Sequence, residues 1–141
     1  MKHLLRHLLI VAAVVAAFWV VSAWPRINDV ETGRTPEYPD LTVRDYGTSP
    51  DAVVKGVKTV LSRLPRWELV GSGKGPSGAE AQAVHTTGFL RFKDDVTIRV
   101  RREKGRTFVS VRSKSRIGKW DFGQNARNVR EFLKALDREV F

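Results

Sequence analysis

The 141-residue chain contains no cysteine. This absence excludes disulfide bonds, thiolate metal sites, a cysteine nucleophile and lipid attachment through cysteine. Histidine is almost as scarce, since His85 is the one histidine beyond the first seven residues. A single histidine cannot build a metal site, and no acidic residue is spaced around it as a catalytic triad requires. We therefore predict no metal, no cofactor and no catalytic residue, and we interpret His85 as part of a strand.

Acidic residues are the minority charge. The chain has 25 Lys and Arg against 15 Asp and Glu, which gives a formal net charge of +10. This balance favours anionic partners such as lipid headgroups, an acidic protein surface or nucleic acid. Nucleic acid is not expected, because the N-terminal sequence predicts export and no RNA-binding aromatic motif is present.

The longest apolar segment of the chain lies near its N-terminus and carries no charge and no proline. Residues 8–23 read LLIVAAVVAAFWVVSA. As a helix, residues 8–24 would extend roughly 25 Å, which approaches the thickness of a hydrocarbon core. Trp19 and Trp24 suit the far interface of a membrane. We therefore predict that residues 8–24 contact the lipid bilayer.

Two interpretations of residues 1–24 stay open, a single-pass transmembrane anchor and a cleaved signal segment. Val21-Ser22-Ala23 has the small residues that a signal peptidase needs, although the apolar run is long for a signal. Lys2 and Arg6 favour a cytoplasmic N-terminus, so both interpretations send the rest of the chain across the membrane. We predict a cytoplasmic (inner) membrane protein with a periplasmic or otherwise exported domain, or secretion to the periplasm after cleavage.

The remaining chain divides into a linker and one domain. Residues 25–48 contain three prolines and no helical period, so we expect an extended linker that lies along the domain or spaces it from the bilayer. Residues 49–141 begin with Ser49-Pro50-Asp51, which predicts a helix start. That helix must end near Pro65. A second helix follows Asp121, the expected N-cap of a capping box with Gln124, and continues to the C-terminus.

Between the two helices the sequence alternates with the period of strands. Residues 66–70 predict a short strand, and the glycine-rich residues 71–78 predict a flexible turn. Three more extended segments follow at residues 80–92, 96–101 and 109–112. We predict an α+β fold, an antiparallel sheet of about four strands packed by two helices on one face.

Polar residues are dense between the last strand and the last helix, from Val111 to Asn125. This stretch, with Asp94-Asp95 upstream, resembles the DUF1499 family of bacteria and plastids. The residues that carry the resemblance are Arg112-Ser113, Ser115-Arg116, Gly118, Asp121, Gly123, Asn125 and Phe132-Leu133. It covers residues 36–138. The activity of the family is unassigned, so the resemblance implies a domain and no mechanism.

The same residues allow two interpretations. The first is an anion site at the helix N-terminus. Its members would be Arg112, Ser113, Ser115, Arg116 and Asn125. The second is structural: Arg116 pairs with Asp95, Asp121 caps the helix, and Gly118 and Gly123 allow tight turns.

Several arginines fall on the outward positions of the predicted strands. Arg99 and Arg101, with Arg91 and Arg112, would lie on the open face of the sheet. They form either a solvated polar face or a cationic surface for headgroups or an acidic subunit.

Together these patterns predict a membrane-anchored, non-enzymatic accessory or interaction protein. Its basic domain would dock on a membrane protein complex or a headgroup surface. The alternative is a domain that binds or acts on a small anionic ligand at the Arg112–Asn125 junction.

Overall fold

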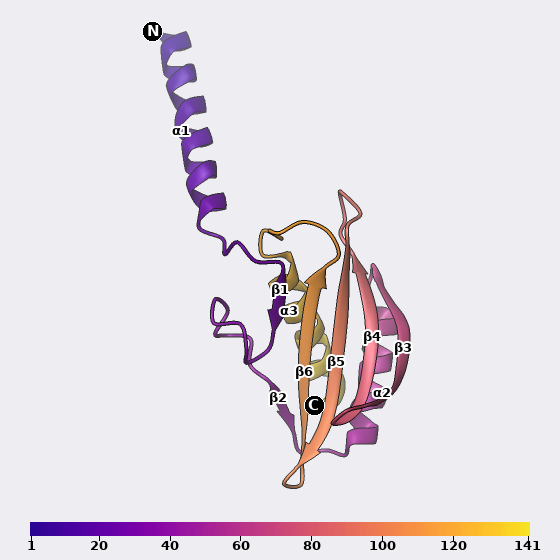
Figure 1. Ribbon diagram of the computed structural model, residues 1–141. Coiled ribbons are helices and arrows are strands. Elements are labelled where there is room, and N and C mark those ends of the chain that lie inside the picture. The colour runs from indigo at the N-terminus through magenta and orange to yellow at the C-terminus, as the bar shows by residue number, and fades with distance from the viewer.

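A single antiparallel sheet with two helices on one face forms the domain in the computed structural model, which describes residues 1–141 (Figure 1). The α+β prediction is confirmed. In chain order the elements are α1 (Lys2–Ser22), β1 (Asp29–Glu31), β2 (Arg44–Tyr46), α2 (Pro50–Arg63), β3 (Trp67–Gly75), β4 (Gly78–Thr86), β5 (Lys93–Glu103), β6 (Arg106–Ser115) and α3 (Gln124–Val140).

Strands β3 to β6 form an antiparallel meander, and the two short strands β1 and β2 form the sheet edge beside β6. The strand order of the sheet is β1-β6-β5-β4-β3, and β2 also pairs with β6. Both short strands come from residues 25–48, the segment expected to be a linker, and both pair antiparallel with β6. This segment therefore lies along the sheet, and it places β1 beside the end of β6.

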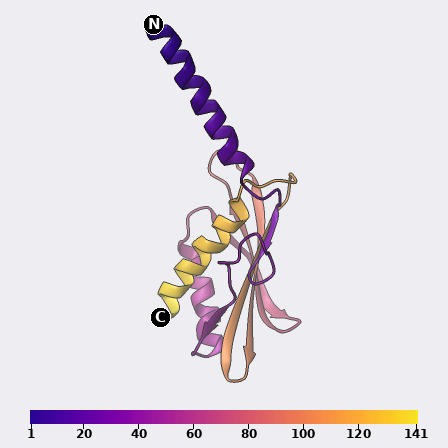
Figure 2. The same cartoon turned by 90° about the vertical axis from the view of Figure 1, so that its left-hand side faces the viewer.

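Helices α2 and α3 cover the same face of the sheet, and the core lies between them and the strands (Figure 2). The alternating residues Val96, Ile98 and Val100 of β5 are buried against this layer, as their period of two predicts. Phe132 and Leu136 of α3 meet them from the helix side. The opposite face of the sheet carries no helix.

Two strand boundaries differ from the sequence predictions. The glycine-rich segment expected to be a turn instead continues β3 to Gly75, paired with β4, and the chain reverses at Pro76-Ser77. Gly78 has φ +150, and a Cβ there would collide with the carbonyl oxygen of Val100. The strand expected to reach residue 92 ends at Thr86 instead, because residues 87–92 form a loop closed by Thr87 N–H donating to the Phe92 carbonyl.

Helix α1 projects away from the domain and buries none of its residues (Figures 1 and 2). It is long and apolar enough to cross a membrane, with a mean hydropathy of 2.3. A signal sequence near an N-terminus meets the same criteria. The helix is thus compatible with both predicted roles of residues 1–24.

Candidate functional site

The junction between β6 and α3 is a tight loop with left-handed backbone. Phe122 has φ +52, and Gly118 and Gly123 have φ +83 and +76. Asp121 accepts hydrogen bonds from the backbone N–H groups of Gly123 (2.8 Å) and Asn125 (2.9 Å). The carboxylate thus binds N–H groups at the helix start, as a cap does.

The helix begins later than the predicted capping box requires. Gly123 occupies the N-cap position, and Gln124 is the first helical residue rather than the third. The reason is the left-handed pair Phe122-Gly123, which turns the chain so that Asp121 reaches the N–H groups from two residues upstream. The Gln124 side chain then donates to Asn128 Oδ1 over 2.8 Å.

A buried polar network lies directly beneath this junction. Ser113 Oγ donates to Asn125 Oδ1 over 2.6 Å. Asn128 Nδ2 donates both to Ser113 Oγ (3.1 Å) and to Asp94 Oδ2 (2.8 Å). All four side chains are buried. Two residues proposed as anion donors, Ser113 and Asn125, are therefore hydrogen-bonded inside the protein. Ser115 Oγ likewise accepts from Asn125 Nδ2 over 2.8 Å.

The junction arginines face carboxylates. Arg116 makes a two-point ion pair with Asp95, at 2.7 Å from Nη2 to Oδ1, on the exposed side of β5. Arg112 donates from Nε to Asp29 Oδ1 over 2.8 Å. The hydrogen bond from Arg112 holds the pKa of the Asp29 carboxyl below its usual value. Neither guanidinium is left without an anionic partner.

Arg99 and Arg101 lie on the open face of the sheet, where acidic residues also gather. Arg99 Nε donates to Glu80 over 3.0 Å, and its Nη1 lies 3.4 Å from Glu31. Arg101 lies 3.6 Å from Glu103. With Arg34 and Arg112, these two arginines line a polar hollow of about 370 Å³. The neighbouring carboxylates largely balance the positive charge of this hollow.

Sequence reasoning missed Asn128 as a member of the buried network and His85 as its buried neighbour, whose Nδ1 has no hydrogen-bond partner. Asn128 stands one turn after Asn125 on the apolar side of α3, and polar residues at two such positions were the available signal. His85 lies on β4, as predicted for a strand residue, with Nδ1 3.7 Å from Asp94 Oδ2. Asp94 and Asp95 point to opposite faces, since Asp94 is buried and Asp95 is exposed. No group of three potential metal ligands occurs in the chain.

Two loops meet at the end of the sheet that is next to α1 (Figure 1). We name residues 87–92 and 116–123 the α1-proximal loops. Residues 24–28 hold the second loop close to α1: Asp121 N–H donates to the Ile27 carbonyl over 3.0 Å, and Arg26 lies over the Trp120 ring at 5.2 Å. The loop is therefore fixed within a few residues of the end of α1.

The α1-proximal loops expose large apolar side chains. These are Phe89 (94% exposed), Leu90 (60%), Ile117 (58%), Phe92 (43%) and Phe122 (43%). A cavity of about 400 Å³ opens between the two loops, and its lining also includes the polar residues Asp94, Ser115, Asp121 and Gln124.

Cations without an ion-pair partner also gather at this end. They are Arg26, Arg91, Lys93 and Lys119, none of which has a carboxylate within 4.0 Å. Two nearby acids are already engaged, because Asp95 pairs with Arg116 and Asp121 binds backbone N–H groups. This end therefore combines exposed apolar surface with uncompensated positive charge.

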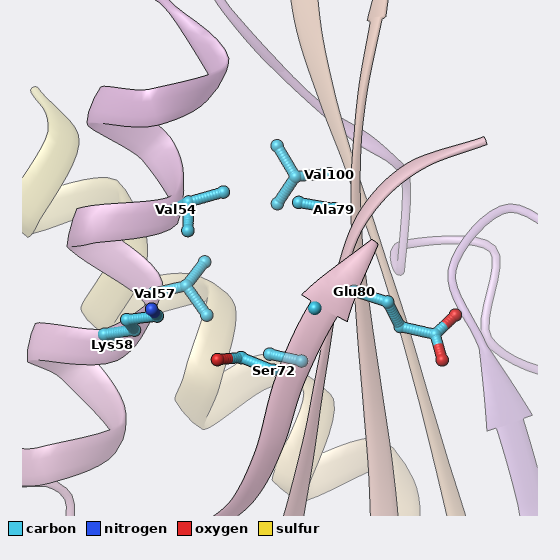
Figure 3. Close-up of a pocket in the computed structure, with 9 residues that line it drawn as sticks. Val54, Val57, Lys58, Ser72, Ala79, Glu80 and Val100 are labelled. Atoms are coloured by element: carbon cyan, nitrogen blue, oxygen red, sulfur yellow. The ribbon is translucent and has the colours of Figure 1, made fainter. Parts of the chain in front are cut away.

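A smaller apolar hollow of about 170 Å³ separates α2 from β3 and β4 (Figure 3). Val54 and Val57 of α2 face Ala79 and Val100 across it, while Glu80 points away toward the open face. Few polar atoms reach this hollow, so it offers little to orient a ligand.

The geometry defines an α+β domain that follows an apolar helix and presents a polar strand–helix junction. The chain belongs to the DUF1499 family, described as a protein of unknown function, whose model matches residues 20–136. The matched range begins at residue 20, whereas the resemblance was expected to begin at residue 36. The match therefore includes β1 as well as β2.

No curated protein matches the chain. Among solved structures, the chain is similar to the crystal structure of TTHA0849 from Thermus thermophilus, at 16% sequence identity and a TM-score of 0.39. The alignment covers 79% of this chain and 96% of that one.

Proposed function

We propose that this protein is a membrane-anchored interaction protein, not an enzyme, whose domain docks on the headgroup surface of the membrane that α1 spans. The domain lies on the exported side. One observation carries the proposal: the exposed apolar side chains and the uncompensated cations gather on the α1-proximal loops and the adjoining residues.

The short connection from α1 to the sheet supports this proposal. Residues 23–28 join the end of α1 to β1, and six extended residues reach at most about 20 Å. Trp24 packs against Gly123, which shortens the connection further. When α1 spans a bilayer, the α1-proximal loops stay close to the headgroups.

The chemistry of this end matches a membrane interface. Phe89 and Leu90 can enter the boundary between headgroups and acyl chains, where apolar side chains are stabilised. Arg91 and Lys119 lie on the same loops, and each cation near an anionic surface contributes about 1 kcal/mol. A membrane protein complex is the other predicted partner. The test below contains lipid and no other protein, so docking seen there does not depend on such a complex.

The alternative of a small anionic ligand at Arg112–Asn125 receives less support. Arg112 and Arg116 already bind Asp29 and Asp95, and an anion would have to displace a carboxylate from either one. Displacement costs the two-point hydrogen bonds that stabilise such pairs.

A lipid-only reconstitution tests docking. Because the chain lacks cysteine, Phe89→Cys gives one attachment site for an environment-sensitive fluorophore. The full chain is placed in nanodiscs of phosphatidylcholine with phosphatidylglycerol. We expect blue-shifted emission at position 89 and water-like emission at Glu103→Cys, on the turn at the far end of β5. Water-like emission at both positions would refute headgroup docking.

A separate experiment in intact cells tests on which side of the membrane the domain lies. A membrane-impermeant maleimide should label the Glu103→Cys variant before the cells are opened. Labelling that requires lysis would place the domain in the cytoplasm.

A further inference from the structure

The cavity between the α1-proximal loops has the composition of a site for an amphiphile. Its outer walls are apolar and include Phe89, Leu90, Phe92, Ile117 and Phe122. Its lining also includes Asp94, which is 1% exposed. A volume of about 400 Å³ suits a headgroup with its glycerol rather than a complete two-chain lipid.

Asp94 supplies a hydrogen-bond acceptor that the protein leaves unused. The residue is 1% exposed, and its Oδ2 accepts from Asn128 Nδ2. No protein group donates a hydrogen bond to Asp94 Oδ1. A carboxylate oxygen without a protein donor can accept a hydrogen bond from a group that enters the cavity.

Trp120 supplies the complementary group. Its indole Nε1 is buried and has no acceptor in the protein, although the residue lines the same cavity. The ring is fixed between Phe122, whose centroid lies 4.3 Å away, and the guanidinium of Arg26. The residue with the unused acceptor and the residue with the unused donor therefore line the same cavity.

We infer that this cavity binds the headgroup of an aminophospholipid. The ammonium group donates to Asp94 Oδ1, a phosphate or ester oxygen accepts from Trp120 Nε1, and the acyl chains pass between the apolar loops into the bilayer. The occupant follows from the place of the cavity between the α1-proximal loops, one of which residues 24–28 hold close to the end of α1, so the inference rests on the proposed docking at the headgroup surface.

Two phospholipids that differ in donor capacity test the inference. The full chain in detergent is mixed with phosphatidylethanolamine or with phosphatidylcholine of the same acyl chains, and bound lipid is measured by native mass spectrometry. Phosphatidylcholine has the same phosphate but no N–H donor. We expect about tenfold more phosphatidylethanolamine bound, the effect of one hydrogen bond to a charged acceptor.

Variants assign the preference to the site. Asp94→Asn turns the unused acceptor into an amide donor while it keeps an oxygen for Asn128, so the preference should disappear. Asp95→Asn, exposed on the opposite face, is the matched control and should keep it. Trp120→Phe should weaken binding of both lipids equally, which keeps the inference testable if Asp94→Asn does not fold.

Equal binding of the two lipids by the unmodified chain would overturn the inference, as would a preference that survives in folded Asp94→Asn. The experiment contains no bilayer, so its result is independent of docking. Lipid preference without a fluorescence shift at position 89 would count against docking alone, and the reverse pattern would count against the cavity alone.

Discussion

Arg112 and Asp29 join β6 to β1 by a two-point ion pair across 83 residues of sequence. The pair lies on the short edge strand that follows residues 23–28, beside the position where Ser115 N–H donates to the Asn28 carbonyl over 2.9 Å. It therefore fixes the position of the domain relative to the end of α1, and breaking it should loosen that connection.

The ion pair predicts an acid-sensitive contribution to stability. The hydrogen bond from Arg112 lowers the pKa of Asp29 in the folded protein, so the pair contributes stability above the unfolded pKa, about 3.9. This contribution is lost as the pH falls through the folded pKa. Asp29→Asn should cost about 1 kcal/mol at neutral pH. Once the pH is below the folded pKa of Asp29, the variant and the unmodified chain should converge.

Urea unfolding of the full chain in detergent, followed over this pH range, measures both curves. Arg106 pairs with Asp45 on the other short strand, β2, so Asp45→Asn serves as the matched comparison. Parallel curves for Asp29→Asn and the unmodified chain would contradict this role of Arg112.

The buried network under the junction predicts a larger loss. Asn128→Leu removes the donor to Asp94 and Ser113 and leaves two buried acceptors without it. Buried unsatisfied groups cost about 1–3 kcal/mol each, so the free energy of unfolding should fall by at least about 2 kcal/mol. Lys134→Ala, on the exposed side of the same helix, should change it by less than about 0.5 kcal/mol. Similar losses in both variants would contradict a structural role for Asn128.

The backbone at Gly78 predicts a position that accepts only glycine. Its φ of +150 is unfavourable for other residues, and a Cβ would collide with Val100 of the neighbouring strand. Gly78→Ala should destabilise the domain by about 2 kcal/mol or more. Gly73→Ala, where nothing lies within 4 Å of the added carbon, should cost less than about 1 kcal/mol. Thermal unfolding of the two variants measures the contrast, and equal melting temperatures would contradict it.

Much of the fold follows from local patterns. The alternation of Val96, Ile98 and Val100 predicts a half-buried strand, and Ser49 caps α2 by accepting from Ala52 N–H over 3.3 Å. Helix α2 ends at Arg63, just before Pro65, as the missing proline N–H requires.

The remaining elements depend on contacts between distant segments. Strands β1 and β2 have three residues each, too few for a period, and their registers come from β6. At the candidate site, the pair of Arg116 with Asp95 could be predicted, because the predicted meander places the two residues on and just after neighbouring strands. The partner of Arg112 could not, because Asp29 belongs to a strand that the sequence does not indicate. The α1-proximal loops lie together because of the strand order, which local sequence patterns do not show.

Charge reversal tests the electrostatic part of docking. Arg91→Glu with Lys119→Glu places negative charge on both α1-proximal loops and should reduce the docked fraction in anionic nanodiscs by about tenfold or more. Arg102→Glu with Lys134→Glu makes the same change in net charge away from these loops and should leave docking unchanged. Added salt should weaken docking of the unmodified chain. Equal losses in the two double variants would indicate a nonspecific effect of net charge.

The depth of position 89 in the bilayer tests the central claim most directly. A spin label on Phe89→Cys in the reconstituted full chain is exposed to oxygen, which dissolves in lipid, and to a water-soluble nickel complex. We predict that oxygen relaxes this label more strongly than nickel does, and that a label on Glu103→Cys shows the opposite order. A label at position 89 that nickel relaxes as strongly as the one at position 103 would contradict docking of the domain on the membrane.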